Sequence, residues 1–86
     1  MIIKISEEIN SSLELNSYAM DFIDKINSYD ELDFIVDFEG VKFMSCTFAQ
    51  AYYASKKRFP KNITEINLSG DVKPLMDMIE KQIIAD

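Results

Sequence analysis

Three short apolar runs, separated by longer segments with helical periodicity, constrain the fold of this chain more than any other feature. The runs cover residues 2–6, 32–38 and 63–68. The second is rich in residues that suit a buried strand, and the third alternates apolar and polar residues as a half-covered strand does. We therefore predict three strands. Residues 11–16 fit either a short extended piece or a loop.

Amphipathic segments lie between and after these runs, with apolar residues at the i, i+3, i+4 and i+7 spacing of a helix. Their apolar faces consist of Ala19, Phe22, Ile23 and Ile26, then Phe48, Ala51, Tyr52, Ser55 and Phe59, and finally Val72, Leu75, Met76, Ile79 and Ile83. Asn16 or Ser17 can cap the first helix. Asp71 can cap the last helix, and Pro74 suits its first turn, where a missing N–H costs little. We therefore predict three helices.

The order strand, helix, strand, helix, strand, helix predicts an α/β fold with one mainly parallel or mixed sheet and right-handed crossovers. The chain has 86 residues, which corresponds to a single small domain, residues 1–86, with little room for a deep active site. In such sheets, functional groups gather at the carboxyl ends of the strands. The segment that follows the central strand is therefore the first place to look for a site.

Thr47 and Gln50 have the spacing of a capping box at the start of a helix. In this arrangement the Thr47 hydroxyl accepts a hydrogen bond from the Gln50 amide, and the Gln50 side chain accepts one from the Thr47 amide. The helix then begins at Thr47, so Ser45 and Cys46 lie in the loop ahead of its exposed amide groups. Such a position favours phosphate or another anion.

The stretch DFEGVKFMSCTFAQAYY, which begins at Asp37, resembles the signature of the STAS superfamily, which includes the bacterial anti-sigma-factor antagonists. It is similar in particular to a STAS-like branch of bacterial and phage proteins, with Asp-Phe, Gly-Val, a Ser/Thr-rich turn and then Phe. The residues that carry this match are Asp37, Phe38, Gly40, Val41, Phe43, Met44, Thr47 and Phe48.

The resemblance implies a non-enzymatic regulator that docks on a kinase with the histidine-kinase-like ATPase fold and is switched by phosphorylation of the turn. In the antagonists that turn reads Asp-Ser-Ser-Gly, and its first Ser takes the phosphate. Here the aligned order is Ser45, Cys46, Thr47 and Phe48, which puts a thiol at the acceptor position. Phosphorylation would then have to use Ser45 or Thr47.

We expect partner binding through the loop from Gly40 to Thr47 and through the exposed side of the helix after it. The regulatory residues in this interpretation are Ser45, Cys46 and Thr47, and the partner contacts are Asp37, Glu39, Gly40, Met44 and Gln50. A phosphate added to this loop would block docking by its bulk and its charge.

Each of these residues also has a purely structural interpretation. Thr47 can be a helix cap and nothing more. Cys46 can be a small packing residue, and Ser45 can be a hydrogen-bonding group of the loop. Gly40 suits a turn conformation closed to other residues, and an acid such as Asp37 can act for solubility alone. Two other functions stay open: an adaptor with the same fold and no phosphoswitch, and a thiol-based sensor that uses Cys46.

Charge and composition argue against several other classes of function. The net charge of −6 opposes general binding to nucleic acid or anionic lipid. The basic cluster at residues 56–61 closes a helix, where cations interact favourably with the dipole. The chain contains no histidine, so neither a Cys-His nor a Ser-His nucleophilic site can form. We therefore expect no enzymatic activity, no cofactor and no metal.

The N-terminal sequence and the cysteine content bear on the location of the protein. The single cysteine allows no internal disulfide, and the first ten residues lack the charged and apolar regions of a signal peptide. No run approaches the roughly 20 apolar residues that span a bilayer. These features predict a cytoplasmic protein whose partners are other proteins.

Overall fold

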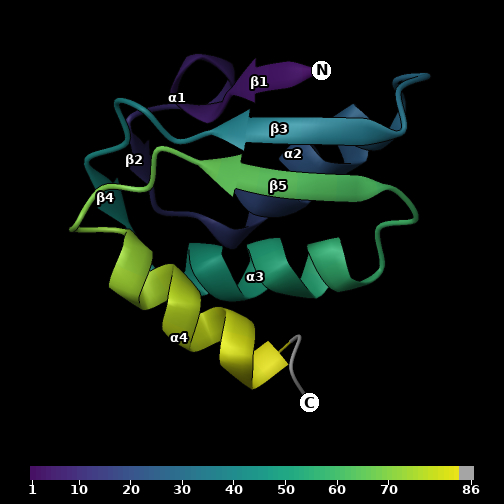
Figure 1. Cartoon of the computed structure of the whole chain (residues 1–86). Coiled ribbons are helices and arrows are strands. Elements are labelled where there is room, and N and C mark those ends of the chain that lie inside the picture. Colours follow the sequence, from purple (N-terminus) through teal and green to yellow (C-terminus); the bar gives the residue numbers. More distant parts are fainter. Residues whose placement is uncertain (84–86) are drawn as a thin grey trace.

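Strands and helices alternate along the chain as predicted, and Figure 1 shows their arrangement in the computed structural model. The structure describes residues 1–83. The elements are β1 (Ile2–Lys4), α1 (Ile5–Glu8), β2 (Ser12–Leu13), α2 (Asn16–Asn27), β3 (Asp33–Asp37), β4 (Phe43–Met44), α3 (Cys46–Lys57), β5 (Asn62–Ile66) and α4 (Lys73–Ile83). The predicted α/β class with a parallel sheet is confirmed.

The main sheet contains β1, β3 and β5 in the order β1-β3-β5, and both pairs are parallel. The register places Ile35 of the central strand beside Ile2 on one side and Thr64 on the other. The two-residue strands β2 and β4 pair in parallel as a second, smaller sheet. Because the three main strands run the same way, their carboxyl ends meet at one edge of the molecule.

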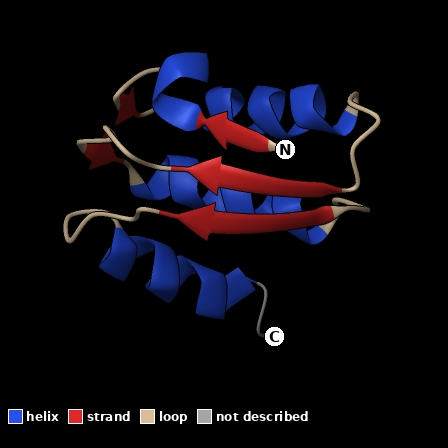
Figure 2. Ribbon diagram, turned by 45° about the horizontal axis from the view of Figure 1, so that its top comes forward, coloured by secondary structure: helices blue, strands red, loops and turns tan. Residues whose placement is uncertain are grey.

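Helices α2 and α3 lie side by side behind one face of the main sheet, and α4 packs against α3 (Figures 1 and 2). Alternate strand residues point into the space between the sheet and these helices, where Phe34, Val36 and Ile63 are buried. They join Phe22 of α2 and Phe48 of α3 in one hydrophobic core. The helices therefore cover one side of the sheet.

The N-terminal segment is shorter as a strand than predicted. β1 ends at Lys4, and Ile5 begins the single turn α1, where its side chain is completely buried. Ile5 therefore belongs to the hydrophobic core, but it lies in a helical turn and not in the strand. Residues 11–16, for which the sequence allowed two interpretations, contain the strand β2, and Leu13 of this strand is also buried.

The capping predicted for α2 is wrong. The helix begins at Asn16 and is preceded by Leu15 in an extended conformation (φ −95°, ψ 136°), so neither Asn16 nor Ser17 occupies the capping position. The Tyr18 amide donates to the Leu15 carbonyl (3.1 Å). Because β2 ends at Leu13, the chain has very little length in which to turn before the helix starts.

Of the two predictions for the start of α4, one is confirmed and the other is wrong. The helix begins at Lys73, and Pro74 lies in its first turn as predicted. Asp71 belongs to the preceding turn and does not cap the helix. In that turn the Ser69 carbonyl accepts hydrogen bonds from the Val72 and Lys73 amides (3.1 and 2.9 Å). The chain thus begins to coil at Ser69, ahead of the predicted cap.

The apolar face of α3 is wider than predicted. Phe48 and Tyr52 are buried as expected, but Ala49 and Tyr53 are buried too, while Ala51 is only partly buried. The reason is that α3 has α2 on one side and α4 on the other as well as the sheet in front (Figure 2). A helix with so many neighbours buries more than the single stripe that periodicity detects.

Candidate functional site

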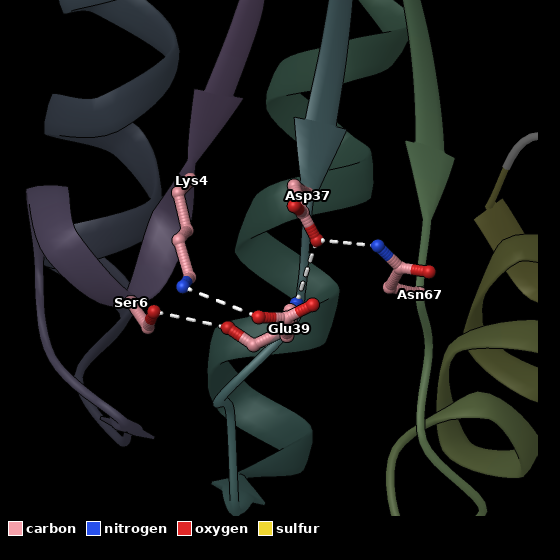
Figure 3. A network of polar contacts seen from close by, with 5 residues as sticks. All are labelled: Lys4, Ser6, Asp37, Glu39 and Asn67. Atoms are coloured by element: carbon pink, nitrogen blue, oxygen red, sulfur yellow. Dashed lines mark hydrogen bonds and ion pairs between the residues drawn. The ribbon is translucent and has the colours of Figure 1, made fainter.

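The loop after β3 is organised by hydrogen bonds to Asp37 (Figure 3). Asp37 Oδ1 accepts one from the Glu39 amide (2.8 Å) and one from the side-chain amide of Asn67 (3.0 Å), just after β5. The bond from Asn67, followed by the bond from the Glu39 amide, lowers the pKa of the Asp37 carboxyl because both favour its ionised form. Asp37 thus joins the carboxyl ends of β3 and β5.

The same loop is joined to β1 and α1 through Glu39 and Gly40. Ser6 Oγ donates to the Glu39 carbonyl (3.0 Å), and Lys4 Nζ lies 3.4 Å from Glu39 Oε1. Gly40 has a φ of +87°, and a Cβ added to it would lie 3.2 Å from Ser6 Oγ. The turn role predicted for Gly40 is therefore confirmed. Asp37 and Glu39 both make contacts inside the fold.

Ser45, rather than Thr47, caps α3. Its Oγ accepts a hydrogen bond from the Phe48 amide (3.0 Å) and donates one to the Glu14 carbonyl (2.7 Å). The predicted capping box is therefore wrong, and Thr47 is the second residue of the helix. Both residue types can cap a helix. Ser45 does so because its amide also donates to the Leu13 carbonyl (2.9 Å), which holds it beside β2.

The start of α3 exposes two of the predicted regulatory residues and one of the predicted partner contacts. Cys46, Thr47 and Gln50 are exposed, whereas Ser45 is partly buried. Cys46 is the first residue of the helix, so the loop position predicted for it is wrong. The packing role considered for Cys46 is also wrong, because its side chain is exposed. Three of the predicted residues therefore lie on one accessible turn.

Met44 does not belong to this surface. It lies in β4 opposite Leu13 of β2 and is 7% exposed, which contradicts a direct contact with a partner. Its neighbour Phe43 is 50% exposed and was not predicted as a contact. The alternation of side chains along a strand is the signal that separates these two residues, but a strand of two residues is too short to be found by periodicity.

A shallow groove, which we call the α3 groove, continues from the first turn along the outer side of α3. Its volume is 380 Å³, and it is lined by Asn16, Thr47, Gln50, Ala51, Ala54, Gln82 and Ile83. The lining from the middle of α3 consists of the small side chains Ala51 and Ala54. The structure therefore brings Thr47 and Gln50 to the groove, whereas Asp37 lies at the end of β3.

The basic cluster at residues 56–61 is used largely inside the fold. Lys57 Nζ donates to the Ile83 carbonyl at the end of α4 (3.1 Å), and Lys61 Nζ donates to the Asn27 carbonyl at the end of α2 (3.2 Å). Cations at these positions interact favourably with the negative ends of the two helices. The cluster therefore stabilises α2 and α4, in addition to the end of α3 that the sequence indicated.

A largely buried polar network that the sequence does not indicate links α3 to β5. Tyr52 Oη donates to Glu65 Oε2 (2.8 Å), and Lys56 Nζ donates to both Glu65 oxygens (3.0 and 2.8 Å). The Lys56 and Glu65 side chains are only 18% and 10% exposed. Burial, reinforced by the Glu65 carboxylate, raises the pKa of Tyr52 well above its ordinary value. Burial likewise raises the pKa of Tyr53.

Within residues 1–83, no group of three or more Cys, Asp and Glu side chains is placed so that it could hold a metal ion. Among the helices that the structure describes, none is long and apolar enough to cross a membrane.

Comparisons of the chain with protein-family models, with curated proteins and with solved structures found no match. The resemblance to STAS-like proteins therefore stays a hypothesis that rests on the motif between Asp37 and Phe48.

Proposed function

We propose that this chain is a non-enzymatic regulatory domain of the cytoplasm that binds a partner protein through the first turn of α3 and the α3 groove. In keeping with the STAS-like resemblance, the partner is an ATPase of the histidine-kinase-like fold. The observation that carries the proposal is the position of Thr47 and Gln50, both exposed, in a groove that continues over small side chains.

The shape and chemistry of this surface support a docking role. Ala51 and Ala54 have short side chains, so a partner can approach the α3 backbone closely along the groove. Phe43, two residues before the helix cap, is 50% exposed and is open to contact by a partner that also reaches the loop ahead of α3. Aromatic residues are enriched at the centres of protein interfaces.

Thr47 suits the proposed phosphorylation better than Ser45 does. Ser45 Oγ already donates to the Glu14 carbonyl, so a phosphate on Ser45 would remove this hydrogen bond and put negative charge against a carbonyl oxygen. Thr47 is exposed in the first turn, where the helix dipole favours a negative charge. Because Thr47 also lines the α3 groove, a phosphate on it would obstruct docking there.

The test is a pull-down from a lysate of the source cells with tagged wild-type, Gln50→Arg and Thr47→Glu chains. We expect the wild type to retain an ATPase of the histidine-kinase-like fold, and each variant to lower its recovery by about tenfold or more. Thr64→Arg adds the same charge as Gln50→Arg but on the sheet, so it serves as the matched control and should retain the ATPase.

Equal recovery with Gln50→Arg and with the wild type would show that the α3 groove is the wrong surface. Retention of a protein of another class would contradict the proposed partner. Mass spectrometry of the peptide that contains Thr47 decides between the two forms of the proposal. Phosphate on Thr47 supports the switch, and retention of the ATPase without phosphate supports the adaptor.

A further inference from the structure

The face of the main sheet opposite α2 and α3 is uncovered. In Figure 2 the three strands stand in front of these helices, and no element of the described chain crosses in front of them. Parallel sheets occur almost only with both faces covered. A parallel sheet with one bare face is therefore a surface on which another element can pack.

The middle of this face is apolar. Strand alternation and the register place Ile2, Ile35 and Thr64 in one row across the sheet, followed by Lys4, Asp37 and Ile66 in the next. Ile2 is 67% exposed, and Ile35 and Ile66 are partly exposed. By the same alternation Asp33 and Asn62 form a further row on this side, and we call these three rows the open face.

The open face carries two carboxylates, Asp33 and Asp37, beside the N-terminal ammonium, which donates to the Asp33 carbonyl (3.1 Å). Asp33 accepts a hydrogen bond from Asn62 (2.8 Å) and Asp37 accepts one from Asn67 (3.0 Å), so each carboxylate has a neutral donor as its partner. Neither forms an ion pair within residues 1–83. Lys4, which lies on the same face, is already paired with Glu39 (Figure 3). An occupant with positive charges around an apolar stripe would complement this arrangement.

The size of the open face selects the kind of occupant. Two spacings of about 4.8 Å between strands make it about 10 Å wide, and five residues of strand make it about 17 Å long. The area is therefore well below the about 800 Å² per partner that a stable dimer requires. A single helix with a diameter of about 10–12 Å fits within an area of this size.

We propose that the open face binds an amphipathic helix of a partner protein, whose apolar stripe covers Ile2, Ile35 and Ile66 and whose flanking Lys or Arg residues face Asp33 and Asp37. This interaction uses the side of the sheet opposite the α3 groove and does not depend on the function proposed for that groove. A chain with both surfaces would hold two partners at once.

The test uses a synthetic helical peptide of about 18 residues, or five turns, with a Leu stripe flanked by Lys and one Trp. The chain contains no Trp, so the peptide fluorescence reports binding without background. We expect binding to the wild-type chain, and binding weaker by about tenfold or more for a peptide with the same Leu stripe and Glu in place of Lys. Amide shifts in NMR spectra should change in β1, β3 and β5.

Two variants with the same added charge locate the site. Thr64→Arg places a cation on the open face, beside Ile35, and should weaken binding of the Lys peptide by about tenfold or more. Gln50→Arg in the α3 groove should change binding by less than about twofold. Ile2→Arg, at an exposed position of β1, repeats the test if Thr64→Arg fails to fold.

Three results would overturn the proposal. Equal weakening by Thr64→Arg and Gln50→Arg would mean that the peptide responds only to the net charge of the chain. Shifts confined to α2, α3 and α4 would place the peptide elsewhere. A wild-type dimer in sedimentation that becomes monomeric with Thr64→Arg would mean that a second copy occupies the face.

Discussion

Gly40 and Ser45 hold the two ends of the segment that leads from the turn after β3 to α3. Gly40 allows the backbone to pass close to Ser6 with a positive φ, and Ser45 joins the start of α3 to the segment after β2. Each position therefore allows a prediction for a single substitution.

Gly40→Ala should destabilise the protein by about 1–2 kcal/mol, because a side chain disfavours the left-handed region and the new Cβ would lie 3.2 Å from Ser6 Oγ. Urea unfolding followed by circular dichroism measures this difference. Gly70→Ala is the control, since nothing lies within 4 Å of its added Cβ, and it should change stability by less than about 1 kcal/mol. Similar costs for both variants would contradict the role assigned to Gly40.

Ser45→Ala should cost about 1–2 kcal/mol of stability, because it removes the cap of α3 and the hydrogen bond to the Glu14 carbonyl. Thr47→Ala, on the exposed side of the same turn, should cost less than about 0.5 kcal/mol. Thermal unfolding of the two variants compares them directly. A larger loss of stability for Thr47→Ala than for Ser45→Ala would mean that Thr47 caps the helix, as the sequence suggested.

Asp37 should titrate below its ordinary range in the folded protein. Because its folded pKa is lower than the unfolded value of about 3.9, its contribution to stability is complete above that pH and is lost as the pH falls through the folded pKa. Asn67→Gly removes the main hydrogen bond and tolerates the positive φ of 58°. NMR titration should show the pKa of Asp37 rising in this variant and unchanged in Asn62→Ala.

Among the elements, α3 and β5 are joined by the only polar network that the described chain buries between a helix and the main sheet. Lys56 and Tyr52 come from successive turns of α3, and Glu65 comes from β5 with its side chain 10% exposed. A largely buried carboxylate lowers the stability of the fold unless nearby groups neutralise its charge and donate hydrogen bonds to it, as Lys56 and Tyr52 do here. The network therefore constrains the orientation of α3 relative to the sheet.

Glu65→Ala should destabilise the protein by about 3 kcal/mol, because it leaves the Lys56 ammonium, 18% exposed, without a counter-ion. Asp77→Ala is the matched control, since the Lys73–Asp77 pair is about half exposed on the surface of α4, and its loss should cost less than about 0.5 kcal/mol. Chemical unfolding measures both. An equally small effect of Glu65→Ala would mean that the network adds no stability.

For the molecule as a whole, one core connects the sheet to α2, α3 and α4. We therefore expect a single cooperative unfolding transition. Tyr52 and Tyr53 are buried, so near-ultraviolet dichroism reports tertiary packing while far-ultraviolet dichroism reports the helices. The two thermal transitions should coincide, and a tyrosine signal that is lost first would indicate that α3 and α4 separate before the sheet unfolds.

The two proposed binding surfaces lie on opposite sides of the molecule, with the sheet and its covering helices between them. The α3 groove is on the outer side of the helices, and the open face is on the other side of the sheet. Substitutions in one surface can therefore be judged with those in the other as controls, since no residue belongs to both.

The order of the three main strands and the three long helices, the parallel α/β class and the turn at Gly40 can be predicted from the sequence alone. These features depend on local periodicity and on backbone conformations that each residue allows, so they can be found without knowing the fold. The exposure of Thr47 and Gln50 follows less directly, because it depends on which side of α3 the neighbouring helices occupy.

Three features depend on the folded chain: which of two competent residues caps α3, that Met44 is buried while Phe43 is exposed, and which carbonyls accept hydrogen bonds from Lys57 and Lys61. So does the face of the parallel sheet that no element of residues 1–83 covers. The physical reason is the same in each case: the deciding contacts join residues that are distant in the chain, such as Ser45 with Glu14, and a pattern confined to neighbouring residues carries no information about them.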